Sequence, residues 1–245
     1  MTDHPVRSVV VLTGAGVSAE SGVPTFRGPG GLWREYRAED LATPEAFARD
    51  PGLVWEWYDW RRQLVARCKP NPAHEAIAEL ERRVPDFLLV TQNVDGLHRQ
   101  AGSRRLVELH GCLWRMRCPR EGTVIEDREV PLSVIPPRCK CGGMLRPDVV
   151  WFGEALPADA LQSALRAAED CDLMLVVGTS AVVQPAASLP LMAKEHGATL
   201  IEVNPDPTPL TGHADETHRG KAADVLPRLL SDHSAFRIPH SAFRP

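Results

Sequence analysis

Four short apolar runs, each ending in small or polar residues, recur along the chain. Their β-branched and aliphatic residues are typical of strands that are buried on both faces of a parallel sheet. Helical patterns lie between these runs, over residues 73–83 and 158–169. This alternation predicts a doubly wound α/β domain of the Rossmann type, in which ligands bind beyond the carboxyl ends of the strands. The predicted strands are 8–13, 87–91, 173–177 and 199–203.

Two segments interrupt the alternation and are expected to form a smaller lobe. Residues 28–72 begin with glycines and continue as a helical stretch rich in Trp and Arg, whereas residues 111–147 contain four cysteines and little helical pattern. The last residues, 231–245, repeat the motif His-Ser-Ala-Phe-Arg and are expected to form a flexible tail. The Rossmann-like domain is then expected to comprise residues 1–27, 73–110 and 148–230.

Composition and charge narrow the class of protein. With 245 residues, of which 43% are hydrophobic and 24% charged, the chain is too apolar for wholesale disorder and too long for a miniprotein. The formal charge of −4 argues against a nucleic-acid partner, whose phosphates need a basic surface. The apolar runs are shorter than the roughly 20 residues of a membrane span, and the N-terminus lacks a leader pattern. We therefore expect a cytoplasmic protein without a membrane partner.

A glycine-rich turn follows the first predicted strand. The sequence Gly14-Ala-Gly-Val-Ser-Ala19 should open a helix, and its glycines would let the backbone approach a pyrophosphate. A tight strand-to-helix turn needs the same glycines, so the motif alone does not decide between the two. A dehydrogenase would next show a second strand with an acidic residue for the ribose, but here a further glycine-rich loop follows.

The run from Gly14 to Arg27, GAGVSAESGVPTFR, closely resembles the signature of the sirtuins, which are NAD-dependent protein lysine deacylases. The resemblance covers nearly all of residues 8–230 and implies NAD⁺ as co-substrate and acylated lysines of proteins or peptides as partners. It implies transfer of the acyl group to ADP-ribose and release of nicotinamide. A sensor of NAD or ADP-ribose, and a mono-ADP-ribosyltransferase, are alternatives that would use the same cleft. Six further blocks in the family's order are TQNVD at 91–95, ELHG at 108–111, LRPD at 145–148, VWFGE at 150–154, GTS at 178–180 and VNPD at 203–206.

The resemblance also implies a set of residues that bind the dinucleotide. Gln92 would contact the ribose, Asn93 would orient the reacting centre, and Asp95 would hold the carboxamide of nicotinamide. From residue types alone, these three could equally cap a turn or a helix. The other residues implied are Gly14, Ala15, Gly16, Ser18, Phe26, Arg27, Gly178, Thr179, Ser180, Asn204 and Ala222.

His110 is a candidate catalytic residue together with Asn93. It ends the apolar segment 106–109 where the cysteine-containing insertion begins, so we expect it at the seam between the lobes. A histidine pKa near 6.5 suits a group that accepts a proton at neutral pH. One histidine among nine is more often a surface or core residue, but the resemblance implies that His110 is the general base toward a ribose hydroxyl.

Tyr58 and Arg61 are three residues apart in a predicted helix and therefore share a face. An arginine fork and a phenol hydroxyl together can hold a carboxylate, although such residues more often cover a core. The sequence resembles the sirtuin subgroup that removes succinyl and malonyl groups, in which this pair and a small residue matching Ala42 shape the acyl pocket. Val150 and Phe152 are expected at the substrate site. A substrate strand would add between residues 149–152 and 181–183, unless these two segments pair internally.

The cysteines depart from the sirtuin pattern of two Cys-x-x-Cys pairs, which is a zinc signature. Here the first pair reads Cys118-Pro-Arg-Glu121 and the second Cys139-Lys-Cys141. We take Cys118, Cys139 and Cys141 as candidate zinc ligands, with Glu121, Cys112 or water completing the shell. The alternative is a degenerate zinc-ribbon-like lobe that has lost its metal.

Overall fold

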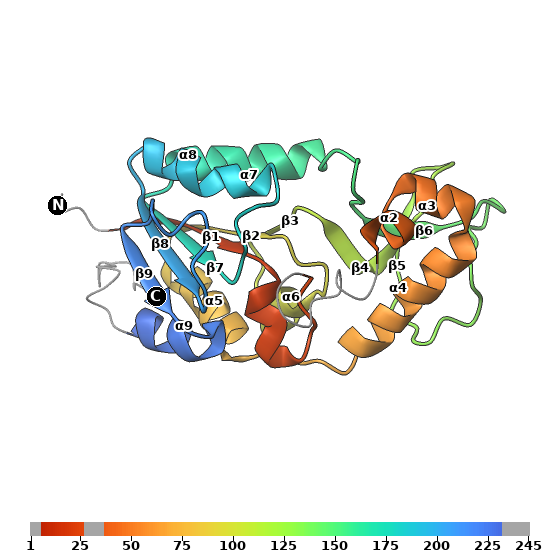
Figure 1. Ribbon diagram of the computed structural model, residues 1–245, viewed down its shortest axis with the longest axis horizontal. Coiled ribbons are helices and arrows are strands. Elements are labelled where there is room, and N and C mark those ends of the chain that lie inside the picture. Colours follow the sequence, from red (N-terminus) through yellow and green to blue (C-terminus); the bar gives the residue numbers. More distant parts are fainter. Residues whose placement is uncertain (1–5, 27–36, 232–245) are drawn as a thin grey trace.

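A computed structural model of the protein describes residues 6–26 and 37–231, and Figure 1 shows two lobes of different secondary structure. Arg27, the glycines after it and residues 232–245 of the expected tail lie outside the described residues. The larger lobe contains a sheet in which every neighbouring pair of strands is parallel, in the order β3-β2-β1-β7-β8-β9. The prediction of a parallel α/β domain is confirmed. The strands are β1 Ser8–Thr13, β2 Asp86–Thr91, β3 Leu106–Glu108, β7 Leu173–Val177, β8 Thr199–Asn204 and β9 Glu216–Arg219.

Helices cover both faces of this sheet because successive side chains of a strand point to opposite faces. On β1, Val9 and Val11 pack with residues of α5 and α9, whereas Val10 and Leu12 pack with residues of α7 and α8. Figure 1 shows these two helix pairs on opposite sides of the sheet. The helices of this lobe are η1 Ala15–Ser21, α5 Pro72–Arg83, α6 Leu97–Ala101, α7 Ala158–Asp170, η2 Ala186–Ser188, α8 Leu189–Glu195 and α9 Ala222–Ser231.

The strand order reverses between β1 and β7, which opens a crevice at their carboxyl ends. The glycine turn after β1 meets the turn after β7 at this point. The N–H of Gly16 donates to the carbonyl of Gly178 at 2.8 Å, and a Cβ added to Gly16 would lie 2.8 Å from the Gly178 Cα. Gly178 has a φ of +60°, in the left-handed region. Glycines therefore allow the two turns to touch, and the segment after Gly14 forms a 3₁₀ helix, η1.

The smaller lobe combines the two interrupting segments, as the sequence predicts. One buried cluster joins Trp55 and Trp57 of α4 to Leu113 of β4 and to Trp151. The predicted boundary between the second insertion and the Rossmann-like domain, at residues 147–148, falls inside β6. The chain returns to the large lobe only after Val149 and Trp151, which belong to this cluster. The antiparallel sheet has the order β5-β4-β6, with β4 Gly111–Arg117, β5 Val124–Glu126 and β6 Arg146–Val149. The helices are α2 Ala38–Leu41, α3 Pro44–Arg49 and α4 Pro51–Val65.

The start of α4 explains how the sequence sets this lobe's longest helix. The Asp50 side chain caps it by accepting from the Leu53 N–H at 2.9 Å, and Pro51 occupies the first turn, where no N–H partner is lost. α4 has 15 residues. Within residues 6–26 and 37–231, none of the helices combines the length and the apolar character that crossing a bilayer requires.

Candidate active site

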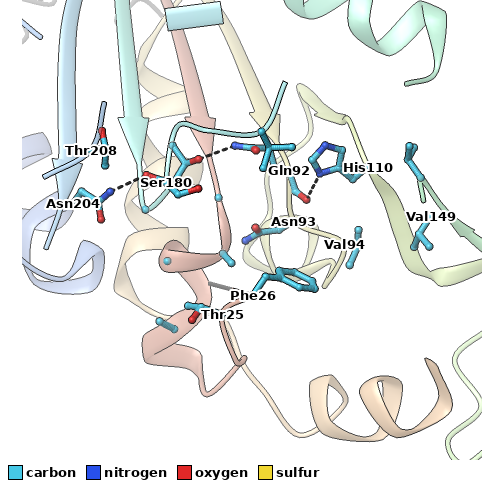
Figure 2. A pocket seen from close by; sticks show the side chains of 18 of the residues that line it. Thr25, Phe26, Gln92, Asn93, Val94, His110, Val149, Ser180, Asn204 and Thr208 are labelled. Carbon is cyan, nitrogen blue, oxygen red and sulfur yellow. Dashed lines mark hydrogen bonds between the residues drawn. The ribbon is translucent and has the colours of Figure 1, made fainter. Parts of the chain in front are cut away.

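A pocket of about 580 Å³ lies where the carboxyl ends of β1, β2, β7 and β8 face the small lobe. Figure 2 shows Phe26, Asn93 and His110 on one side of this pocket and Ser180 and Asn204 on the other. The structure thus brings together residues that are far apart in the sequence. The predicted site residues that line the pocket are Gly14, Ala15, Gly16, Phe26, Ala42, Tyr58, Arg61, Gln92, Asn93, His110, Val150, Phe152, Gly178, Thr179, Ser180, Asn204 and Ala222.

Ser18 and Asp95 are buried behind the pocket wall and do not line it. The Ser18 hydroxyl donates to the Asp95 carboxylate at 2.8 Å and lies 3.1 Å from the Asn93 side-chain amide, which donates to it. Burial raises the pKa of Asp95, and hydrogen bonds from the Leu97 amide and Ser18 lower it in part. In this structure Ser18, itself hydrogen-bonded to Asp95, holds Asn93 in place from behind. Arg27, also predicted for the cofactor, lies outside the described residues.

The His110 ring is oriented by a backbone carbonyl. Its Nδ1 lies 3.0 Å from the carbonyl oxygen of Gln92, which can only accept, so neutral His110 carries its proton on Nδ1 (Figure 2). The Nε2 is then the nitrogen that can take up a proton. Burial lowers the pKa of His110 below 6.5, and the hydrogen bond to Gln92 opposes this change. The ring is therefore neutral at pH 7 and can act as a base.

Side chains at three strand ends are hydrogen-bonded to one another on the sheet side of the pocket. The Gln92 amide donates to the Thr179 hydroxyl at 3.0 Å, and the Asn204 amide donates to the Thr179 carbonyl at 2.8 Å. Residues just after β2 and β7 and the last residue of β8 are thereby linked across the crevice. Together with the Gly14 to Gly16 turn, they form a polar wall at the switch point, where α/β sheets bind nucleotides.

At the small-lobe end, Arg61 is a buried cation that lines the pocket. Its guanidinium carbon lies 4.8 Å from the Phe26 ring centroid and 4.9 Å from that of Trp57, so two aromatic rings hold the group. Among the described residues, none gives Arg61 a carboxylate within 4.0 Å. Burial lowers the pKa of Arg61, since a buried charge lacks the solvation of water. An anion entering this end of the pocket would supply the missing partner.

Tyr58 lies one turn before Arg61 on α4 and also lines the pocket, as their spacing predicts. Burial raises the pKa of its phenol, so the hydroxyl is protonated at neutral pH. Ala42 adds little volume to the same end, and its carbonyl accepts from the Phe152 N–H at 2.9 Å. The Val150 N–H donates to the His110 carbonyl at 3.0 Å. The segment 150–152 therefore ties the His110 region to the Ala42 region.

The two segments expected to pair with a substrate strand, residues 149–152 and 181–183, contain no strand beyond Val149. β6 ends at Val149, and residues 152–153 form a turn; residues 181–183 have no strand either. The two segments are not paired with each other, because the partner of β6 is β4. Phe152 and Val182 are both exposed, at 46% and 50%.

The cysteine cluster lies in the small lobe and does not line the pocket. The ligand atoms of Cys118, Glu121, Cys139 and Cys141 all lie within 4.8 Å of one another. The Sγ atoms of Cys118 and Cys141 are 3.7 Å apart, close to the roughly 3.8 Å edge of a tetrahedron with zinc–sulfur bonds of about 2.3 Å. Glu121 Oε2 lies 3.3 Å from Cys139 Sγ. Of the completing ligands left open by the sequence, Glu121 is in the group and Cys112 is not.

Several residues that line the pocket lie outside the set predicted from the sequence. Trp57 and Trp151 belong to motifs in which other residues drew attention, and Glu20 belongs to the short 3₁₀ helix. Residues 205–209, which follow β8 and include three prolines, also line the pocket. The motif VNPD indicates that loop, but among its residues the prediction includes only Asn204. The predominance of prolines there gave no hint of a ligand.

Comparison with known proteins identifies the family. The Sir2 family matches residues 14–185, and the chain belongs to that family, as its resemblance to the sirtuins predicts. A protein of Pyrobaculum aerophilum named NAD-dependent protein deacylase 2 is 58% identical over 228 residues, covering 92% of this chain and 91% of that protein.

Solved structures agree with this assignment. An ADP-ribose complex of a mutant Sir2 homologue is 54% identical, with a TM-score of 0.90, and the match covers 92% of this chain and 91% of that one. A complex of Sir2 with a p53 peptide and NAD⁺ is 34% identical, with a TM-score of 0.84 and 94% coverage of each chain. The Rossmann-like fold with a smaller lobe is thereby confirmed.

Proposed function

We propose that this chain is an NAD-dependent protein-lysine deacylase whose acyl pocket is suited to acidic acyl groups such as succinyl and malonyl. The family and the names of its relatives support the deacylase activity and the use of NAD. The single observation that carries the preference for acidic acyl groups is Arg61, a pocket-lining buried cation that has no carboxylate within 4.0 Å among the described residues and feels only the longer-range charge of Asp95.

The residues at the strand ends fit a dinucleotide. Gly14 to Gly16 and Gly178 let backbone approach the phosphates, while Gln92 and Asn204 offer amides to the sugars. When bound, NAD supplies the ADP-ribosyl group that accepts the acyl group, with release of nicotinamide.

The residues around the reacting centre have separate tasks. His110 Nε2 accepts the proton of a ribose hydroxyl, because the Gln92 carbonyl keeps the other ring nitrogen protonated. Asn93, held by Ser18, orients the groups that react, and Phe26 shields them from water. The chain's contribution is thus positioning and one proton transfer.

Peptide and protein substrates are supported by the peptide complex of a structural neighbour. Val150 and Phe152 lie at the mouth of the acyl end, between His110 and Ala42. A peptide backbone bound there through main-chain hydrogen bonds would be recognised with little dependence on side chains. Several proteins would then serve as substrates.

The cysteine cluster fits a structural zinc ion. Three thiolates and the Glu121 carboxylate provide four ligands within reach of one centre, which is the number that closed structural sites use. Zinc would cross-link the loop before β5 to the segment before β6 and stabilise the small lobe. Metal analysis of protein purified without a histidine tag should find about one zinc per chain, and its absence would favour the metal-free lobe.

Three sequence predictions are retained as proposals. The domain division is kept, with Rossmann-like segments 1–27, 73–110 and 148–230 and insertions 28–72 and 111–147, except that the end of β6 and Trp151 pack with the small lobe. A cytoplasmic location is supported by the six cysteines, all of which are unpaired. The absence of a nucleic-acid partner is supported by the acidic net charge.

The test compares acyl groups in one pair of variants. Arg61→Met should lower kcat/KM for a succinyl-lysine peptide by about 10- to 150-fold, since a charge-assisted hydrogen bond contributes about 1.5–3 kcal/mol. Deacetylation should change by less than about twofold. Arg49→Met, which removes an exposed arginine of the same lobe outside the pocket, is the matched control. Equal losses with both peptides in Arg61→Met would contradict the acidic-acyl proposal.

Nicotinamide release distinguishes the deacylase from the other uses of the cleft. A deacylase releases nicotinamide only with an acylated peptide and forms O-acyl-ADP-ribose, which mass spectrometry identifies. A sensor would release none, and an ADP-ribosyltransferase would leave the label on protein.

A further inference from the structure

Trp151 is a buried residue of the segment expected to contact the substrate and lines the pocket, and its indole N–H donates to the Tyr58 hydroxyl at 3.0 Å. The two residues are 93 positions apart in the sequence, so only the folded structure brings them together. The indole N–H is a donor only, and the phenol has one proton and one in-plane acceptor direction. The Tyr58 oxygen must therefore accept from Trp151, and its own proton must point elsewhere.

The position of the Trp151 ring is fixed on several sides. The Arg146 guanidinium carbon lies 3.5 Å from the ring centroid, and the Phe47 ring lies 5.2 Å away at 41°. Arg146 is itself held by two hydrogen bonds to the Glu154 carboxylate, at 2.5 and 2.9 Å. Glu154 also accepts from the Trp151 backbone N–H at 2.9 Å. The indole N–H therefore has little freedom to turn away from Tyr58.

The hydroxyl proton of Tyr58 is free to point into the pocket. Tyr58 makes no hydrogen bond as a donor to another described residue, and it lines the pocket beside Arg61, whose guanidinium carbon is 5.9 Å from the phenol ring centroid. A carboxylate bound by Arg61 would be within reach of this proton. Burial raises the pKa of Tyr58, so the proton is present at neutral pH.

We infer that Trp151 is a positioning residue for acyl selectivity: by donating to Tyr58, it aims the phenol proton at a substrate carboxylate next to Arg61. The inference rests on the proposed preference for acidic acyl groups and adds a residue to it. An acetyl group has no carboxylate to accept this proton, so Trp151 affects acidic substrates selectively.

A double-mutant cycle tests the inference on kcat and KM for succinyl- and acetyl-lysine peptides. Trp151→Phe should reduce kcat/KM for the succinyl peptide about three- to tenfold, mainly through KM, with deacetylation changed by less than about twofold. Tyr58→Phe should give a similar loss, and Trp151→Phe in the Tyr58→Phe background should give no further selective loss. Benzothienylalanine at position 151 removes the same N–H, retains the ring volume and should reproduce the loss.

The control is Trp55→Phe, because Trp55 is equally buried on α4 and its indole N–H donates to the Leu145 carbonyl at 2.9 Å, away from Tyr58. This variant should keep the ratio of the two activities of the wild type. Equal losses with both peptides in Trp151→Phe, or additive losses in the cycle, would overturn the inference. The proposed preference for acidic acyl groups is tested independently of Trp151. It is contradicted if Arg61→Met loses activity equally with the succinyl and the acetyl peptide.

Discussion

Protonation of His74 is predicted to destabilise the fold and to disturb the network behind the pocket. His74 is fully buried in α5, and the Asn71 backbone N–H donates to its Nδ1 at 3.3 Å. The ring proton is therefore on Nε2, which lies 3.2 Å from the Ser18 hydroxyl and donates to it. A second proton on Nδ1 would face another N–H donor. Burial lowers the pKa of His74 from 6.5 to about 4.

The sign and size of the effect follow from this difference. The unfolded chain takes up the proton near pH 6.5, and the folded chain takes it up only near pH 4. The contribution of neutral His74 is thus complete above pH 6.5 and is lost as the pH falls toward 4. At about 1.36 kcal/mol for each pH unit, the loss reaches about 3 kcal/mol at pH 4.

The assay is urea unfolding of the wild type and of His74→Gln at several pH values between 7 and 4. The advantage of the wild type over His74→Gln should shrink by about 3 kcal/mol across this range. The control is Ile77→Val, at a buried position on the same helix. It removes a methylene group but leaves every titratable side chain in place. Its difference from the wild type should stay constant with pH. An advantage over His74→Gln that does not change with pH would refute the argument.

Three more predictions concern the pocket and the metal site. Gly16→Ala should lower the unfolding free energy by about 1–3 kcal/mol and weaken NAD binding in calorimetry, because its Cβ would lie 2.8 Å from Gly178 backbone atoms; unchanged binding would contradict this. His110→Tyr should abolish turnover to O-acyl-ADP-ribose but retain NAD binding, and the wild-type kcat/KM should fall on its acid side with an apparent pKa below 6.5. Turnover in the variant, or an acid-side pKa above 6.5, would remove His110 as the base. Glu121→Ala should lower zinc content and thermal stability, whereas equal zinc in variant and wild type would show that Glu121 is not a ligand.

The strands that carry the site could be predicted because their signal is local. A parallel strand buried on both faces needs a continuous apolar run, and β1 and β7 have the predicted bounds. β9, with the sequence ETHR, could not be found in this way. Three of its four residues are exposed, and its place in the sheet depends on pairing with β8. The pattern of hydrophobic positions does not predict that pairing.

The residues around the pocket were predictable as a set, but their arrangement was not. Glycines and polar residues at strand ends show where a nucleotide binds, but not that Ser18 and Asp95 lie behind Asn93. The contact between Trp151 and Tyr58 depends on the packing of two distant segments. For the metal ligands, spacing left several candidates, and only the fold separates Glu121 from the others.

The most direct test of the account is a crystal structure of the protein with a succinyl-lysine peptide and an unreactive NAD analogue. We expect the succinyl carboxylate within about 3 Å of both the Arg61 guanidinium and the Tyr58 hydroxyl, with His110 Nε2 facing the ribose that carries nicotinamide. A carboxylate that points to solvent, or a His110 ring turned away from that ribose, would contradict the account.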